Sequence, residues 1–147
     1  MSAIYVRYYV LEEHDETAPV VIELNLAQVA LKSEQEVDAV LGKGTHAGLY
    51  RDSRVNCEKC PKVIYKGGKV EVTFINGMAD HILIHNLTSY DFNDRVILGL
   101  LDLKEDIDPN IDNKELKQWD NYQKYSQISA FGRGGKLQYI LVKAKSL

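Results

Sequence analysis

Hydrophobic and polar residues alternate in several short stretches of the chain, a pattern that indicates β-strands. Residues 4 to 10 place apolar side chains at every second position, as expected of a strand with one face on a core. A β-branched run follows over residues 20 to 26, and the acidic stretch between the two runs is polar enough for a hairpin loop. We therefore predict an antiparallel pair of strands at the start of the chain.

A short helix is predicted after this pair. Ser33 and Glu36 have the spacing of a capping box, in which a hydroxyl and a carboxylate accept hydrogen bonds from amides at the start of a helix. An apolar stripe with helical spacing follows and stops at Gly42, the residue type that most often ends a helix. The helix should therefore occupy the residues between this box and Gly42.

Turn residues in the middle of the chain predict a run of antiparallel strands. Two β-branched stretches, residues 63 to 65 and residues 70 to 74, flank a pair of glycines that can supply the positive φ of a tight turn. An Asn-Gly dipeptide marks a second turn, and residues 81 to 85 suit a third strand. On that strand His81 and His85 would share one face, because side chains alternate with a period of two.

The second half of the chain predicts helices followed by a closing hairpin. Residues 95 to 103 are apolar without a clean period, so both helix and strand stay open, with helix favoured. A capping pattern at its start predicts another helix over residues 112 to 124. Residues 125 to 131 and residues 136 to 145 then form a hairpin around a glycine-rich turn.

These elements together predict an α+β fold. We expect a mostly antiparallel sheet of about six to eight strands, with two or three helices packed on one face. No internal repeat, linker or low-complexity tract divides the sequence. Residues 1 to 147 are therefore expected to form a single domain with one core.

Composition places the chain among ordinary globular proteins. Hydrophobic residues make up 45% and charged residues 27% of the chain, and the net charge of -3 favours neither disorder nor a nucleic-acid partner. Two cysteines only three positions apart cannot cross-link distant segments, and the first residues do not resemble a signal peptide. The longest apolar runs fall far short of the ~20 residues of a membrane-spanning helix. We expect a cytoplasmic protein without a membrane partner.

Four soft metal ligands lie at suggestive spacings, namely Cys57, Cys60, His81 and His85. Zinc favours four such ligands in a tetrahedral arrangement, and a Cys-x-x-Cys turn commonly presents two of them. Residues four apart on a strand are about 13 Å apart, however, so a strand over residues 81 to 85 separates the two imidazoles. The competing interpretation is a reduced surface turn at the cysteines and two partly buried sheet histidines.

The same region also resembles the start of an HNH-type nuclease. The resemblance rests on Asp80-His81-Ile82 downstream of the cysteine pair, with Asn93 further along the chain. In that family such a histidine activates water against a phosphodiester. The chain has no second cysteine pair and no histidine after His85, so it cannot complete such a site alone. A zinc-containing nucleic-acid-binding module or HNH-like nuclease is therefore the alternative function.

Basic residues surround the cysteines and provide a candidate ligand-binding surface. The candidate ligand-binding residues are Arg51, Arg54, Lys62, Tyr65, Lys66 and, in the glycine-rich turn, Arg133. Arginine and lysine can bind anionic groups, and exposed tyrosine adds contact area with a polar tip. A solvated, non-binding face is the simpler interpretation of such a charge cluster. Nine tyrosines against three phenylalanines nonetheless favour a surface used in recognition.

The sequence shows no assembled catalytic motif. It contains no Gly-x-Ser-x-Gly elbow, and neither His46 nor His85 begins a phosphoesterase-type His-x-Ser/Thr motif. We therefore expect a non-enzymatic binding protein for a protein partner or a small anionic ligand, with inhibitor or immunity-type proteins as one class that fits. Homo-oligomer formation, a nucleic-acid partner, and a metal-free enzyme with His81 or His85 as base stay open.

Overall fold

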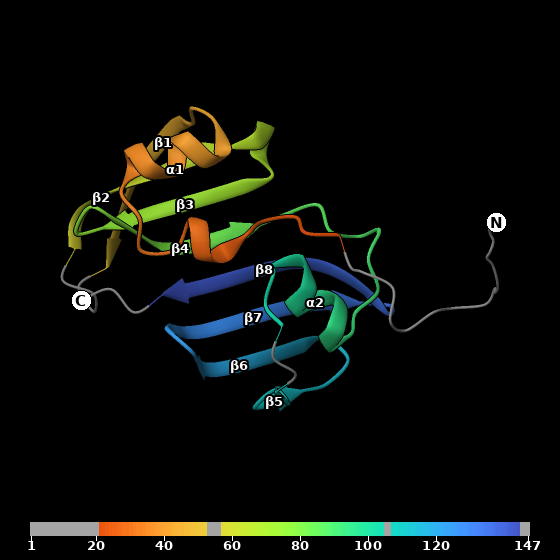
Figure 1. Ribbon diagram of the computed structural model, residues 1–147. Coiled ribbons are helices and arrows are strands. Elements are labelled where there is room, and N and C mark those ends of the chain that lie inside the picture. The colour runs from red at the N-terminus through yellow and green to blue at the C-terminus, as the bar shows by residue number, and fades with distance from the viewer. Residues whose placement is uncertain (1–20, 53–56, 105–106, 145–147) are drawn as a thin grey trace.

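A computed structural model of the chain describes residues 21 to 52, 57 to 104 and 107 to 144 (Figure 1). For residues 50 to 52 and 57 to 59 it describes the backbone alone. The described strands form one antiparallel sheet of eight strands, in the order β1-β2-β3-β4-β8-β7-β6-β5. The predicted antiparallel α+β sheet is thereby confirmed.

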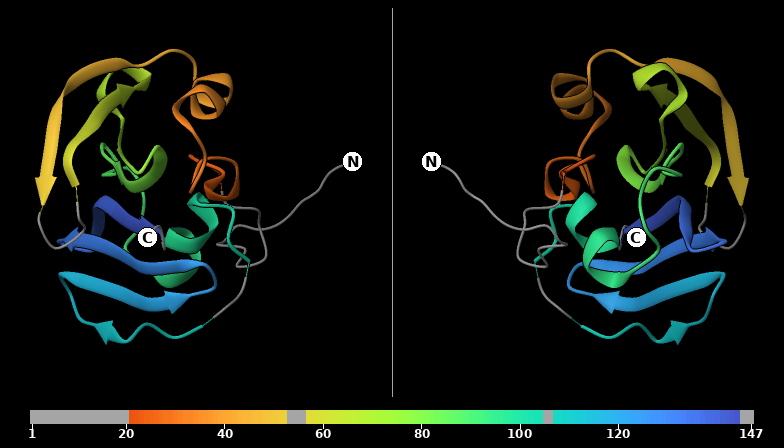
Figure 2. Two further views of the ribbon diagram at one scale, coloured as in Figure 1. Left: turned by 90° about the vertical axis from the view of Figure 1, so that its left-hand side faces the viewer. Right: turned by 90° about the vertical axis from the view of Figure 1, so that its right-hand side faces the viewer.

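The strands are β1 Thr45–Asp52, β2 Cys57–Tyr65, β3 Val70–Ile75, β4 Met78–Ile84, β5 Ile111–Asp112, β6 Leu116–Tyr122, β7 Tyr125–Arg133 and β8 Lys136–Ala144. The two α-helices of the described part are α1 Glu34–Leu41 and α2 Asp94–Leu100, and its two 3-10 turns are η1 Leu26–Gln28 and η3 Lys66–Gly68. Figure 2 shows that the sheet is strongly curved along the order of its strands. Buried side chains from η1, α1, α2 and the strands belong to one hydrophobic cluster.

The local signals for α1 and for the central strands are confirmed. Ser33 Oγ accepts a hydrogen bond from the Glu36 amide at 3.2 Å, and the Ser33 amide donates to Glu36 Oε1 at 2.9 Å. Strands β2, β3 and β4 form the expected antiparallel run. Asn76 and Gly77 make the turn between β3 and β4, with φ angles of 55° and 77°. Backbone requirements of caps and turns therefore fix these elements locally.

The segment before β2 differs from the prediction. Strand β1 occupies residues for which the sequence analysis predicted no helix or strand, and both cysteines lie on β2 instead of on a surface turn. The two strands pair antiparallel, with Thr45 opposite Ile64 and irregularities further along. The sequence of β1 contains little β-branched alternation, so its strand conformation comes from pairing with β2 and not from local preference.

The β-branched run over residues 20 to 26 is not a strand where the structure describes it. The amides of Glu23 and Leu24 donate to the Leu100 carbonyl at 2.9 and 3.0 Å, and the Leu26 amide donates to the Leu101 carbonyl at 3.3 Å. This segment therefore supplies donors to carbonyls at the end of α2, where a helix leaves such groups without partners. The strand predicted over residues 4 to 10 lies outside the described residues.

Helix α2 confirms the helical preference of its segment, and Asn93 caps it by accepting a hydrogen bond from the Val96 amide at 2.9 Å. The helix predicted over residues 112 to 124 is wrong, because β5 and β6 occupy that segment. The apparent capping pattern is a turn, in which Asn113 Oδ1 accepts hydrogen bonds from the amides of Glu115 and Leu116. Pairing of β6 with β7 overrides the helical spacing.

An ion cluster ties α2 to the edge of the sheet. Lys117 on β6 is 14% exposed and lies 2.7 Å from Asp112 Oδ1 and 3.1 Å from Asp94 Oδ1. The contact with Asp94 is close enough for an ion pair but is not aligned as a hydrogen bond, since that oxygen has no hydrogen-bond partner. Burial acts to lower the pKa of Lys117, but its two carboxylate partners outweigh burial and raise the pKa.

The closing hairpin of β7 and β8 is confirmed, with two irregularities that the sequence did not indicate, one of them next to the hairpin turn. Phe131 lies opposite Tyr139, whereas the next residue, Gly132, lies opposite Leu137. Gln138 is thus the extra residue of a β-bulge, which shifts the alternation of inward and outward side chains along β8. Within the described residues, no helix is both long and apolar enough to cross a membrane.

Candidate binding site on the outer face of the sheet

Strands β4, β8 and β7 lie side by side in the middle of the sheet. Their fully buried side chains join the hydrophobic cluster and include Ile82, Ile84, Ile128, Ala130, Leu137, Ile140 and Val142. The residues between them are mostly half-buried and project from the opposite side, because side chains alternate along a strand. We call this side of β4, β8 and β7 the outer face; it carries His81, Leu83, Phe131, Tyr139 and Leu141.

Three rings form a row across the outer face. Phe131 of β7 and Tyr139 of β8 are register partners, and their rings stack with centroids 4.5 Å apart and planes 17° apart. His85, which directly follows β4, lies on the other side of Tyr139 with ring centroids 6.5 Å apart. The Tyr139 side chain is 37% exposed, so the row presents apolar surface to solvent. Stacked cross-strand rings hold each other in place and need no partner to become ordered.

An open pocket of about 540 Å³ lies along this row of rings. His85, Phe131 and Tyr139 line it together with polar groups from the loop after β4 and from the β-bulge, namely Asn86, Thr88 and Gln138. The volume falls within the range of about 300 to 1,000 Å³ that is typical of ligand pockets. The bulge at Gln138 is what places that residue and Tyr139 together at the pocket.

One cation and one carboxylate complete the lining of the pocket. Arg133 is exposed at the end of β7, and its side chain makes no ion pair or hydrogen bond with any residue that the structure describes. Glu115 lies beside it, because the Glu115 carbonyl accepts a hydrogen bond from the Gly132 amide at 3.0 Å. The Arg133 guanidinium therefore offers its planar set of donors to a ligand without first breaking an internal ion pair.

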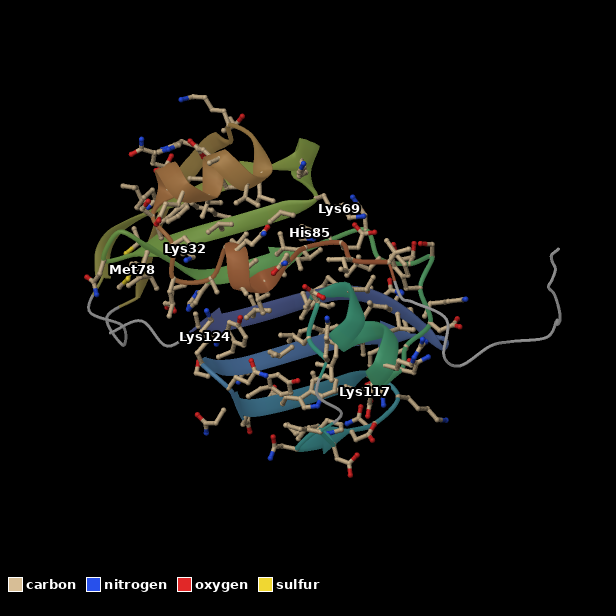
Figure 3. The ribbon with its side chains drawn as sticks, in the orientation of Figure 1. Lys32, Lys69, Met78, His85, Lys117 and Lys124 are labelled. Atoms are coloured by element: carbon tan, nitrogen blue, oxygen red, sulfur yellow. The ribbon has the colours of Figure 1, made fainter. Side chains whose placement is uncertain are left out.

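His85 is held by a carboxylate at the edge of the pocket. Its Nε2 lies 2.7 Å from Glu71 Oε2, and Lys62 Nζ lies 3.1 Å from Glu71 Oε1. The His85 amide donates to the Lys69 carbonyl at 2.8 Å, and Figure 3 shows these two residues close together. Burial acts to raise the pKa of Glu71, but the hydrogen bonds from His85 and Lys62 outweigh burial and lower the pKa. Glu71 therefore stays ionised and fixes the orientation of the imidazole.

The residues that the sequence nominated for ligand binding do not form one surface. Arg133 lines the pocket, and Lys62 lies near it through Glu71. Lys66 is exposed in η3, at the turn between β2 and β3. Arg51 is described by its backbone alone and Arg54 lies outside the described residues.

Tyr65 differs most from its predicted place on a binding surface. Its side chain is 1% exposed, and its hydroxyl donates to Asp38 Oδ1 at 2.8 Å. Burial, followed by the hydrogen bond to Asp38, raises the pKa of Tyr65. The tyrosine occupies a core position because inward side chains of β2 alternate with outward ones such as Lys62. Tyr65 therefore joins β2 to α1 and is not exposed to a ligand.

The predicted zinc ligands are distributed over two strands. His81 and His85 share the outer face, as expected for a strand, but His81 lies opposite Thr73 and Lys143 whereas His85 binds Glu71. Cys60 is 3% exposed and is disulfide-bonded, so the interpretation of a reduced cysteine on a surface turn is wrong for this residue. No group of three or more histidine, cysteine, aspartate or glutamate side chains within the described ranges could hold a metal ion. Zinc binds reduced thiolates, so a zinc site that includes Cys60 would require its disulfide to be reduced. The side chain of Cys57 lies outside the described ranges, and zinc stays a prediction.

The residues behind the nuclease resemblance have structural partners. Asn93 caps α2, and Asp80 is 4% exposed at an irregularity in the pairing of β3 and β4. Comparison of the chain with family models, with curated proteins and with solved structures found no match. The interpretation of the outer face therefore rests on its own geometry.

Proposed function

We propose that the chain is a non-enzymatic binding protein that recognises an acidic segment of a partner protein through the outer face. The observation that carries the proposal is the pocket itself, in which the unpaired Arg133 lies beside the stacked rings of Phe131 and Tyr139. Aromatic residues and arginine dominate the energetics of protein interfaces because they combine contact area with directed hydrogen bonds.

We also propose that both helices pack on the concave face of the curved sheet, which leaves the outer face available. Figure 2 supports this arrangement, since α1 and α2 lie on the same side of the strands. Their buried residues belong to the same cluster as the inward residues of β4, β7 and β8. Neither described α-helix then covers this central face of the sheet, and its half-buried apolar and aromatic groups make it a candidate for an interaction surface.

A second cation supports an acidic partner. Lys143 projects from the outer face opposite His81 and Gln127, and it makes no ion pair with any described residue. Arg133 lies opposite Lys136, which precedes Lys143 by seven positions on β8. Arg133 and Lys143 therefore lie about 20 Å apart along the strands. Carboxylates of a partner at both ends of this stretch would gain favourable electrostatics, and rings and Leu141 would fill the space between them.

An inhibitor or immunity-type protein would act in this way, by covering the functional surface of its partner. A second copy of the chain is another partner that the outer face could accept. The acidic-partner proposal requires that capture depend on the positive charge at Arg133, whatever the identity of the partner.

A differential pull-down tests the proposal. The tagged full-length chain, its Arg133→Glu variant and its Lys43→Glu variant are used to capture partners from a lysate, and the recovered proteins are quantified. Lys43 is an exposed lysine directly after α1, so it controls for the change in net charge. We expect a stoichiometric acidic partner with wild type and Lys43→Glu, and about tenfold less with Arg133→Glu. Equal recovery with all three proteins would refute the proposed surface.

A further inference from the structure

We infer that the pocket beside Arg133 accepts a carboxylate that is carried next to an aromatic ring, such as the end of a peptide with an aromatic last residue. This inference rests on the proposed function and names the chemical group of the partner that enters the pocket. It follows from the charges of the lining, from its rings and from its hydrogen-bonding groups.

The charges of the lining favour a single negative charge. Arg133 is the one described cation among the lining residues apart from His85, whose Nε2 is already engaged by Glu71. Glu115 contributes a negative charge to the same lining. A dianionic phosphate would meet one unpaired guanidinium and one repelling carboxylate, whereas a carboxylate needs only the two parallel hydrogen bonds that a guanidinium provides.

The rings favour an aromatic group next to that carboxylate. Phe131 and Tyr139 are already stacked on each other, so a ligand ring would meet the exposed part of this pair in an edge-to-face arrangement. Gln138 and Asn86 lie on the pocket lining and carry side-chain amides that can bond to a peptide group. An aromatic amino acid at the end of a peptide combines the ring, the peptide group and the carboxylate within a few bonds.

Four probes separate these contributions. N-acetylphenylalanine carries both the ring and the carboxylate. N-acetylphenylalanine amide lacks the negative charge, and N-acetylalanine lacks the ring. Phenyl phosphate replaces the carboxylate by a dianion. Binding to the full-length chain is followed by changes in the backbone amide signals of the isotope-labelled protein. We expect saturable binding of N-acetylphenylalanine with a Kd in the millimolar range, and weaker binding of the other three by about fivefold or more.

Two variants assign the binding to the pocket. Arg133→Gln should weaken binding of N-acetylphenylalanine by about fivefold to tenfold and leave binding of N-acetylphenylalanine amide unchanged. Tyr139→Leu should weaken binding of both compounds. Lys43→Gln is the control and should bind like wild type. Thermal melting of each variant establishes that it is folded; because Arg133 and Tyr139 are exposed, both variants should fold.

Several outcomes would overturn the inference. These are absence of saturable binding by N-acetylphenylalanine, tighter binding of phenyl phosphate, and equal binding by wild type and Arg133→Gln. If any of them occurs while partner capture still depends on Arg133, only the assignment of the group is wrong and the proposed function stands. If capture is independent of Arg133 as well, the proposed function fails with it.

Discussion

Replacement of Gly132 by alanine provides a quantitative test of how the strand below the pocket is packed. A Cβ atom at this position would lie 2.6 Å from two ring carbons of Phe92 and 2.7 Å from a third. Carbon atoms prefer separations of about 3.5 to 4.0 Å, so the ring would have to retreat by about 1 Å. Phe92 cannot retreat freely, because its amide donates to the Gly135 carbonyl at 3.0 Å and its ring packs against the core cluster.

The magnitude follows from two opposing terms. Overpacking of this kind costs about 1 to 3 kcal/mol, whereas replacing glycine by alanine gains about 0.4 to 1 kcal/mol by restricting the unfolded chain. Gly132 has no positive φ, so no backbone strain is added. We expect Gly132→Ala to lower the free energy of unfolding by about 1 to 2 kcal/mol in urea titrations.

A double-mutant cycle identifies the clash as the cause of this loss. Phe92→Leu removes the ring face that the new methyl group would meet, so the loss caused by Gly132→Ala should be much smaller in the Phe92→Leu background. If Gly132→Ala is as stable as wild type, or if the two substitutions are additive, the close packing of Phe92 on Gly132 is wrong.

Three further predictions concern other polar contacts. Tyr65→Phe removes the hydrogen bond to Asp38 and should cost about 1 to 2 kcal/mol in urea unfolding; an unchanged midpoint would contradict that contact. Lys117→Met leaves two carboxylates without their cation and should cost about 2 to 3 kcal/mol, whereas the exposed control Lys136→Met should cost less than about 1 kcal/mol. The lowered pKa of Glu71 stabilises the fold above the ordinary carboxyl pKa of 4.5, and this contribution is lost as pH falls through the lowered pKa. Glu71→Gln should therefore reduce stability at about pH 7 but lose less on acidification than wild type, and parallel losses would argue against the proposed pairing.

Elements specified by local chemistry could be predicted from the sequence. The capping box of Ser33 and Glu36 fixes the start of α1, and the turn at Asn76 and Gly77 fixes the hairpin of β3 and β4. These signals act within a few residues and need no distant partner. These signals were sufficient to predict the antiparallel class of the sheet, helix α1 and most of the central strands of the sheet.

Elements specified by distant partners could not be predicted in the same way. Leu24 and Leu26 pack in the core and their amides bond to the end of α2, and alternation does not distinguish this arrangement from a strand. The helical spacing on β6 was misleading because pairing with β7 decides that segment. The bulge at Gln138 reversed the side-chain directions that simple alternation gives for β8.

The candidate site could be predicted only in part for the same reason. Arg133 was nominated because it lies in a glycine-rich turn, and it does line the pocket. Its neighbours Phe131 and Tyr139 lie on β7 and β8, and His85 directly follows β4, so only the strand order brings them together. Tyr65 was nominated with the basic residues around it, but strand alternation buries its side chain and exposes Lys62.

We propose above that the outer face of β4, β8 and β7 is the recognition surface. Mapping the backbone amide signals of the isotope-labelled chain, before and after addition of the captured partner, tests this most directly. We expect the largest changes on residues around Arg133, Tyr139 and Lys143, and we expect these changes to diminish at high salt. Changes centred instead on α1 or β1, with the signals of those three residues unaffected, would contradict it.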